Sequence, residues 1–132
     1  MSENYDLAVI GSGPGGYVCA IRAAQLGLNV LCIDKRGAHG GTCLNVGCIP
    51  SKALLHASEV YHETKSSSLM GINVDNVSIN LQEMMNYKEE GINGNVKGID
   101  FLFKKNKVES IYGIAKISVS YTHLRAHETA CY

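Results

Sequence analysis

A glycine-rich turn at residues 11–16 most constrains the fold, because its glycines have the spacing G-x-G-x-x-G. The apolar residues 5–10 precede this turn and predict a buried parallel strand. Residues 17–26 predict a helix, and the apolar residues 29–33 predict a second strand that ends at Asp34. Two parallel strands need a crossover connection between them, so the chain is expected to be an α/β protein with a parallel sheet and flanking helices.

Each glycine of this motif has a physical role in binding a dinucleotide. Gly11 permits the tight turn out of the strand, Gly13 lets a pyrophosphate approach the backbone, and Gly16 lets the helix lie close to the strand. The free N–H groups at the helix N-terminus favour a phosphate there. Asp34 ends the next strand, where a carboxylate can accept hydrogen bonds from ribose hydroxyls. A glycine-rich turn of another α/β fold is the alternative, but this context favours a Rossmann-like unit.

Composition and charge exclude several classes of function. The 132 residues include 12 Lys plus Arg and 12 Asp plus Glu, so the formal net charge is zero. A neutral chain has no electrostatic attraction to nucleic acid or to an anionic membrane. No apolar run approaches the roughly 18 residues of a membrane span, and residues 1–6 lack the segments of a secretion signal. We therefore expect no nucleic-acid or membrane partner and no secretion.

The cysteines fall into two groups. Five occur, at positions 19, 32, 43, 48 and 131, and this odd number with wide spacing does not resemble the disulfide framework of a secreted domain. Cys19 and Cys32 lie among apolar residues and are expected to pack as small hydrophobic side chains. Cys43 and Cys48 lie in the run Gly-Gly-Thr-Cys-Leu-Asn-Val-Gly-Cys-Ile-Pro-Ser-Lys, at residues 40–52. This second pair is the candidate for reactive thiols.

A bond between Cys43 and Cys48 would require a distorted helix. A regular helix separates the Cα atoms of residues i and i+5 by roughly 8 to 9 Å, whereas a disulfide needs less than about 7 Å. Gly47 can adopt unusual dihedrals and Pro50 disfavours a regular hydrogen-bond ladder, so both fit a distorted start. A helix N-terminus also favours a thiolate. Buried free thiols, a structural disulfide and half of a zinc site are the alternatives to a reactive pair, which is favoured.

The rest of the chain predicts two more helices and a third strand. Residues 35–42 are expected to form a loop, and a helix should run from about residue 42 to residue 64. Pro50 should bend or interrupt the early part of this helix. Residues 80–105 have a loose helical period that three glycines weaken, and they predict another helix. Residues 108–115 predict a strand followed by a turn.

The glycine motif together with residues 40–56 resembles the class I pyridine nucleotide–disulfide oxidoreductases. The second run reads Gly-Gly-Thr-Cys-Leu-Asn-Val-Gly-Cys-Ile-Pro-Ser-Lys-Ala-Leu-Leu-His. Within this family the chain resembles the dihydrolipoamide dehydrogenases more than the glutathione and mercuric reductases, because Leu44 and residues 53–56 favour the lipoamide enzymes. The resemblance covers about residues 3–118 and implies a Rossmann-like FAD-binding domain.

The resemblance implies a role for each part of the two motifs. Cys48 would face the flavin as the charge-transfer thiol, Cys43 would be the interchange thiol that meets dihydrolipoamide, and Lys52 would lie near flavin N5. The glycine motif would hold the FAD pyrophosphate, Asp34 would bind the adenosine ribose, and residues 35–42 would wrap the cofactor. The implied FAD contacts are Gly11, Gly13, Pro14, Gly15, Gly16, Asp34, Lys35, Gly41, Thr42, Cys43, Cys48, Lys52, Gly113 and Ala115.

The implied reaction is the ping-pong oxidation of dihydrolipoamide with NAD⁺. Dihydrolipoamide would reduce a Cys43–Cys48 disulfide by thiolate exchange, and the electrons would pass through FAD to NAD⁺. The implied partner is the lipoyl domain of a 2-oxoacid dehydrogenase complex, and the complete enzyme would be a homodimer. The implied location is the bacterial cytoplasm or the mitochondrial matrix, with a part in cell redox homeostasis.

The chain departs from the family in its length. It contains no second G-x-G-x-x-G motif for NAD⁺, and it lacks the family's C-terminal interface segment with its His–Glu base. Residues 1–118 are expected to be the N-terminal segment of the FAD-binding domain, inactive alone, and residues 119–132 a disordered or artefactual tail. His123 and His127 have the spacing of metal ligands without further ligands, so no metal site is expected. A non-catalytic module that binds nucleotide weakly or not at all is the alternative.

Overall fold

A three-stranded parallel sheet forms the base of the molecule. The computed structural model describes residues 4–66 and 70–116. The strand order is β1-β2-β3, with β1 at Leu7–Ile10, β2 at Val30–Asp34 and β3 at Glu109–Tyr112. β2 is therefore the central strand, and the expected parallel α/β fold is confirmed.

The register brings the carboxyl ends of all three strands to one edge. Ile10 pairs with Ile33, and Ile33 pairs in turn with Ile111. The backbone N–H of Gly11 donates to the carbonyl of Ile33 at 2.7 Å, and that of Gly113 donates to the carbonyl of Asp34 at 2.8 Å. The turns that follow β1 and β3 are thus both anchored to β2.

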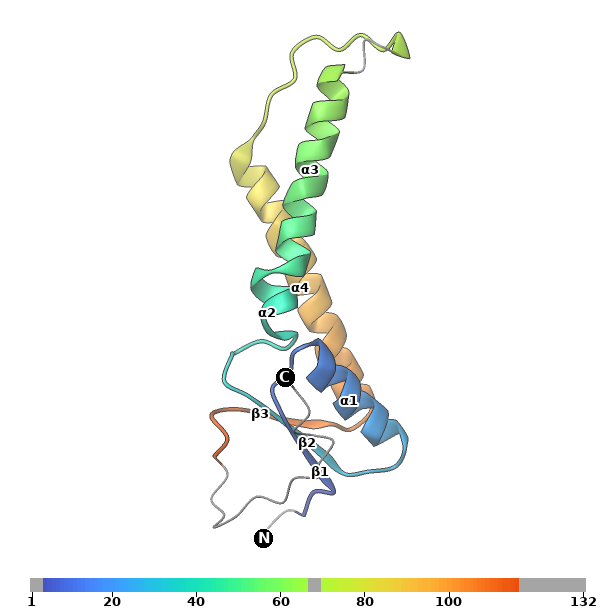
Figure 1. Ribbon diagram of the computed structural model, residues 1–132, viewed down its shortest axis with the longest axis vertical. Coiled ribbons are helices and arrows are strands. Elements are labelled where there is room, and N and C mark those ends of the chain that lie inside the picture. Colours follow the sequence, from blue (N-terminus) through green and yellow to red (C-terminus); the bar gives the residue numbers. More distant parts are fainter. Residues whose placement is uncertain (1–3, 67–69, 117–132) are drawn as a thin grey trace, which may run out of the picture.

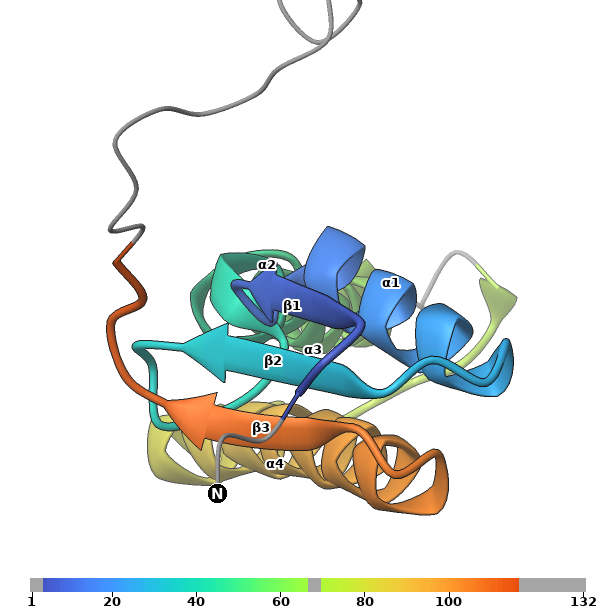
Figure 2. The ribbon, with the colours of Figure 1, turned by 90° about the horizontal axis from the view of Figure 1, so that it is seen from below.

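The helices cover one face of this sheet (Figure 1 and Figure 2). α1 (Pro14–Gln25), α2 (Gly41–Val46) and α4 (Leu81–Lys105) lie on the same side of the sheet, and Figure 2 views the sheet from its other side. α3 (Cys48–Ser66) follows α2 and packs along α4. α3 and the first half of α4 extend away from the sheet as a long pair of helices (Figure 1).

α1 begins at Pro14, three residues before its expected start at Tyr17. The expectation treated the whole glycine motif as a turn. Proline has no N–H to lose and its φ is already helical, so it is tolerated in the first turn of a helix. Gly15 and Gly16 therefore belong to the first turn of α1, and only the start of the motif is a loop.

The break between α2 and α3 lies at Gly47, and its expected position at Pro50 is wrong. Gly47 has φ −124° and ψ −101°, which ends α2. Pro50 lies in the first turn of α3, where its missing N–H costs no helical hydrogen bond. The expected distortion is confirmed, because the Cα atoms of Cys43 and Cys48 approach to 4.7 Å, within the range of a disulfide.

α4 confirms the helix expected over residues 80–105. The side-chain oxygen of Asn80 accepts hydrogen bonds from the backbone N–H groups of Gln82 at 3.1 Å and Glu83 at 3.3 Å. This cap satisfies two donors that the helix leaves free. The helix is amphipathic despite its glycines, and its buried residues are Ile92, Ile99 and Phe103.

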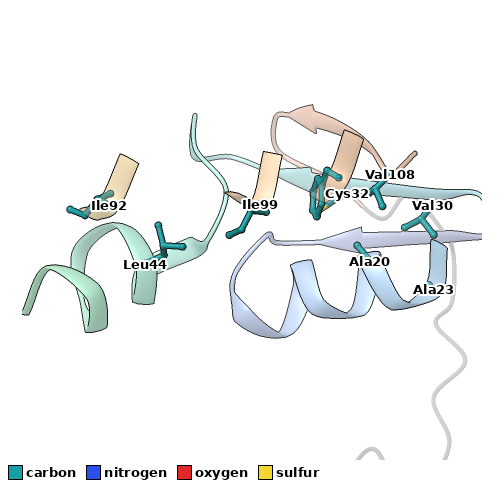
Figure 3. Close-up of a cluster of buried hydrophobic side chains, with 9 residues drawn as sticks. Ala20, Ala23, Val30, Cys32, Leu44, Ile92, Ile99 and Val108 are labelled. Carbon is teal, nitrogen blue, oxygen red and sulfur yellow. The ribbon is translucent and has the colours of Figure 1, made fainter. Parts of the chain in front are cut away.

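The hydrophobic core lies between the sheet and the helices (Figure 3). Its buried residues are Ala20, Ala23, Val30, Cys32, Leu44, Ile92, Ile99, Phe103 and Val108. The expected burial of Cys32 is confirmed, whereas Cys19 is exposed and its expected burial is wrong. The stripe of α1 that faces the core passes through Tyr17, Ala20 and Ala24, and the 3.6-residue helical period places Cys19 outside it.

Candidate nucleotide and disulfide site

An open cavity of about 320 Å³ lies at the carboxyl ends of the three strands. Ligands of open α/β sheets bind outside these strand ends, and pockets for small molecules range from about 300 to 1,000 Å³. The cavity is lined by seven of the residues that the sequence indicated as cofactor contacts: Gly11, Asp34, Lys35, Gly41, Thr42, Gly113 and Ala115. The structure therefore gathers half of the indicated contacts, from four separate segments, around one space.

Four further residues line the cavity: Ile10, Ile33, Arg36 and Ile114. Arg36 lies in the loop that was expected to wrap the cofactor and Ile114 lies between two expected contacts, whereas Ile10 and Ile33 were not foreseen from the sequence. Each is adjacent in sequence to a foreseen contact, and that adjacency was the available signal. Ile10 and Ile114 are 61% and 78% exposed, so they give the cavity an apolar wall that is open to solvent. An apolar wall beside polar groups suits a ligand with a flat aromatic part and a charged part.

Asp34 is held in a network with the glycine motif. One carboxylate oxygen, Oδ2, accepts from the backbone N–H of Ser12 at 2.6 Å and from its hydroxyl at 2.7 Å. The other, Oδ1, accepts from the backbone N–H of Arg36 at 2.8 Å. A carboxylate offers about four acceptor sites, so Oδ1 retains capacity for a ligand hydroxyl. Ser12 is fully buried; sequence reasoning passed over it, although a small polar residue between two glycines was a visible signal.

The pKa of the Asp34 carboxyl is lower than its ordinary value. Burial acts in the opposite direction and would raise this pKa. The hydrogen bonds from the Ser12 hydroxyl and from the N–H groups of Arg36 and Ser12, together with the positive charge of Arg36, outweigh burial. Asp34 is therefore ionised at neutral pH and acts as an acceptor.

Close approaches between glycines bring the start of α2 against the start of α1. A Cβ at Gly41, whose φ is +61°, would lie 2.6 Å from the Cα of Gly13. A Cβ at Gly16 would overlap the carbonyl oxygen of Gly11, so α1 can lie close to β1 only with glycine there. A Cβ at Gly13 would meet nothing closer than 3.9 Å. Gly13 therefore has space beside its backbone.

The other glycine-motif residues lie next to the cavity without lining it. Pro14, Gly15 and Gly16 form the first turn of α1, and Gly13 is its N-cap. No side chain caps this N-terminus. The backbone N–H groups of its first turn are therefore available to an anionic ligand.

Cys43 and Cys48 are joined by a disulfide bond. α2 starts in the cavity wall, at Gly41, and Cys43 follows two residues later. Cys43 is half-buried and Cys48 is exposed. Lys52 lies one turn after Cys48 on α3 and is exposed, so the two share a helix face. The structure places Lys52 near the disulfide and outside the lining of the cavity.

Asn45 fixes the helix that carries Cys43, and sequence reasoning missed it. Its side-chain Nδ2 donates to the carbonyls of His39 at 3.0 Å and Gly41 at 2.8 Å. It is the only polar residue between the two cysteines in the sequence, and that position was the signal. These bonds tie the first turn of α2 to the loop that precedes it.

Neither a metal centre nor a membrane span is found in the described part of the chain. Residues 4–66 and 70–116 contain no group of three His, Cys, Asp or Glu side chains arranged to hold a metal ion. None of the helices in these ranges combines the length and apolar character needed to cross a membrane. The histidines at positions 123 and 127, and the tail expected at residues 119–132, lie outside the described residues.

Comparison with known proteins places the chain in a family. The sequence model of the pyridine nucleotide-disulphide oxidoreductases matches residues 5–132. The mitochondrial dihydrolipoyl dehydrogenase of Schizosaccharomyces pombe is 59% identical over 110 residues, which are 83% of this chain and 22% of that protein. Leghemoglobin reductase of Vigna unguiculata is 56% identical over 116 residues, or 87% of this chain and 22% of that protein. Dihydrolipoyl dehydrogenase 3 of Pseudomonas putida is 50% identical over 116 residues, which are 87% of this chain and 25% of that protein.

The chain spans about a quarter of the length of these curated relatives. The family model covers the glycine motif, the cavity residues and the disulfide. The resemblance inferred from the two motifs is confirmed. This chain belongs to the pyridine nucleotide–disulphide oxidoreductase family.

Proposed function

We propose that this chain is the FAD-binding, disulfide-bearing part of a dihydrolipoyl dehydrogenase. The observation that carries the proposal is the continuity between the cavity and the disulfide. The cavity wall includes Gly41 and Thr42 of α2, and Cys43 is the next residue along this helix. A long ligand that starts at the strand ends and follows α2 would therefore extend toward the two sulfur atoms.

The residues present fit the parts of FAD. Asp34 keeps an acceptor position for the ribose, and the uncapped N-terminus of α1 offers N–H groups to the pyrophosphate. Gly13 leaves the space that a phosphate needs beside the backbone. The turn at residues 113–115 supplies an apolar wall and main-chain groups for the adenine. We propose all fourteen residues indicated by the sequence as the contacts of this site.

The exposure of the two cysteines supports different roles for them. Cys48 is the more exposed of the pair. In the proposed arrangement it faces the flavin, so its exposed surface is the surface that the bound cofactor covers. Cys43 is then the interchange thiol that meets the substrate. Lys52, one turn from Cys48, places a positive charge near the same ring.

The disulfide would accept two electrons from dihydrolipoamide. A substrate thiolate attacks the sulfur of Cys43, which breaks the Cys43–Cys48 bond and releases Cys48 as a thiolate. The second substrate thiol then attacks the mixed disulfide, which closes the lipoamide ring and releases Cys43. Two electrons and two protons have then left the substrate. When bound, the flavin would supply two-electron transfer from the thiols to NAD⁺.

The proposal extends to the longer protein of which such a segment would be part. Its partners would be the lipoyl domain of a 2-oxoacid dehydrogenase complex, a second copy of itself, and NAD⁺ as co-substrate. Its location would be the mitochondrial matrix or the bacterial cytoplasm, which agrees with relatives from mitochondria and from a bacterium. Residues 1–118 would be the FAD-binding segment, and residues 119–132 would lie outside it.

Cofactor protection of the thiols tests this proposal without any assay of turnover. The reduced chain is treated with limiting iodoacetamide, with and without millimolar FAD, and labelling of each cysteine is measured by peptide mass spectrometry. We expect FAD to slow labelling of Cys48 several-fold more than that of Cys43. Labelling of Cys19, exposed on α1, should not change. Unchanged labelling of Cys48 would contradict FAD binding, and stronger protection of Cys43 would contradict the assigned roles.

A matched pair of glycine variants locates the binding site. Gly13→Ala adds a Cβ that the fold tolerates, because its nearest neighbour is 3.9 Å away and φ at Gly13 is −66°. The added methyl group occupies the space proposed for the pyrophosphate, so protection of Cys48 by FAD should be lost. Gly94→Ala, on α4 outside the cavity and with no atom within 4 Å of its Cβ, should keep that protection. Equal protection in both variants would place the cofactor elsewhere.

A further inference from the structure

His39 is a buried histidine that the proposed reaction does not use. It lies in the loop between β2 and α2 and is 4% exposed. Its Nδ1 atom is 2.5 Å from Oδ1 of Asp100 on α4. Its ring centroid lies 4.7 Å from that of Phe103, also on α4, and 5.3 Å from that of Tyr112, the last residue of β3. The side chain thus joins the loop to α4 and β3 and does not line the cavity.

The main chain at His39 contacts both parts of the candidate site. The carbonyl of His39 accepts from Asn45 Nδ2, which also holds the carbonyl of Gly41 at the start of α2. The next residue, Gly40, donates its N–H to the carbonyl of Ser12 in the glycine motif at 2.9 Å. A displacement of this loop from α4 would therefore move the start of α2 and the glycine motif together.

The carboxylate of Asp100 requires His39 to be the donor of the hydrogen bond between them. A carboxylate can only accept, so the Nδ1 atom must carry the hydrogen that Asp100 receives. Burial raises the pKa of the neighbouring Tyr112, and the charges of Asp100 and Asp34 raise it further. The side chain of His39 is 5% exposed and that of Asp100 is 49% exposed. The hydrogen bond is therefore shielded on the histidine side and solvated on the other.

We propose that His39 is a positioning residue for the nucleotide and disulfide site. Its hydrogen bond to Asp100 fastens the loop at residues 35–40 to α4, and through the loop it holds the start of α2 against the glycine motif. The inference rests on the proposed function where it concerns FAD. The tether itself is a property of the chain without cofactor.

Hydrogen exchange in the cofactor-free chain tests the tether. Asp100→Ala removes the acceptor from a half-exposed side chain and leaves no buried cavity. We expect it to speed exchange of the amides at residues 35–47 by about tenfold, the loss expected for one hydrogen bond to a charged group. Asp100→Asn keeps an acceptor oxygen and should restore most of the protection. Glu90→Ala, at an exposed position of the same helix, should match the unmodified chain.

FAD protection of Cys48 and a double variant test whether the hydrogen bond between His39 and Asp100 also positions the cofactor site. Asp100→Ala should raise the FAD concentration that half-protects Cys48 by about tenfold for the same reason, and Asp100→Asn should restore it. His39→Leu keeps the volume of the side chain and removes the donor, and combining it with Asp100→Ala should add little, because the two residues act through one bond.

Three results would overturn the inference: exchange in Asp100→Ala equal to that in Glu90→Ala, full additivity in the double variant, or faster exchange without any change in FAD protection. Absence of FAD protection in the unmodified chain would refute the proposed function instead. In that case the exchange data alone would still establish or refute the tether.

Discussion

The two ends of this molecule differ in what holds them in place (Figure 1). The sheet end comprises residues 4–50 and 92–116, and the arm comprises residues 51–66 and 70–91. The buried hydrophobic residues of the part of the chain that the structure describes all lie in the sheet end: Ala20, Ala23, Val30, Leu31, Cys32, Leu44, Ile92, Ile99, Phe103 and Val108. No described residue of the arm is buried.

The arm consists of parts of α3 and α4, which pack on each other, and of the connection at residues 70–80. Leu55, Met70 and Leu81 are 60%, 73% and 66% exposed. Most helical stability in proteins comes from the packing of an apolar face rather than from intrinsic propensity. The arm should therefore open at a lower free energy than the sheet end, which opens only with global unfolding. The cavity and the disulfide both lie in the sheet end, so the candidate site is built on the part that has its own core.

The largest effect is expected at Gly16, where the sheet end has no room for a side chain. A Cβ there would overlap the backbone carbonyl oxygen of Gly11, which cannot move without separating α1 from β1. Gly16→Ala should lower the free energy of unfolding by about 3 kcal/mol or more, measured by urea denaturation followed by circular dichroism. Gly15→Ala, in the same turn with no atom within 4 Å, should change it by about 0.5 kcal/mol at most.

Equal losses at Gly15 and Gly16 would show that the close contact between α1 and β1 is not the cause. If Gly16→Ala alone fails to fold, the close contact between α1 and β1 is the cause, because both variants make the same glycine-to-alanine change in the same turn. The pair therefore separates backbone contact from helix propensity in one helical turn.

Two leucines compare the sheet end and the arm directly. Leu44 on α2 is 7% exposed and belongs to the core, whereas Leu55 on α3 is 60% exposed. Leu44→Ala should destabilise the chain by about 2 to 3 kcal/mol, through lost burial and the cavity left behind. Leu55→Ala should cost about 0.5 kcal/mol or less. The same denaturation measurement checks both, and a comparable loss at Leu55 would refute the division into two regions.

The sequence could predict much of the sheet end because its signals are local. Glycine spacing, apolar strand runs and a terminal acidic residue each act on their neighbours, and parallel strands necessarily bring their carboxyl ends to one edge. Gly11 and Asp34 could therefore be assigned to one site from the residues themselves, whereas Gly113 was assigned to it through the family resemblance. The bond between Cys43 and Cys48 was implied by the family resemblance, and their spacing predicted only that such a bond would require a distorted helix.

The remaining features depend on long-range contacts or on position within an element. Nothing local distinguishes His39 from any other loop histidine, and its partner Asp100 lies 61 residues away. Gly47 and Pro50 both disfavour a helix, and the choice between them follows from proline's tolerance of a first turn. The exposure of Cys19 depends on which face of α1 meets the sheet, which its apolar neighbours in sequence do not show.

The smallest effect is a dependence of the sheet end on acid, set by Asp34. Its pKa is lower in the folded chain than the ordinary value of 3.8, because the hydrogen bonds from Ser12 and Arg36 and the charge of Arg36 outweigh burial. The stability it contributes is fully present above that ordinary value and is lost as the pH falls through the lower folded-state pKa, because the unfolded chain takes up the proton first. Urea denaturation between pH 6 and about pH 3 should show this loss.

Asp34→Asn should lower stability at neutral pH, since an amide cannot replace all the acceptor contacts to Ser12 and Arg36. The difference between this variant and the unmodified chain should then shrink as the pH falls, because protonation removes the same acceptor from the aspartate. Asp75→Asn removes a charge from an exposed position in the arm and should leave the acid dependence of the sheet end in place. A constant difference for Asp34→Asn across the pH range would mean that its carboxylate contributes packing and no charge-dependent hydrogen bonding, and the sheet end would owe its stability to its apolar core alone.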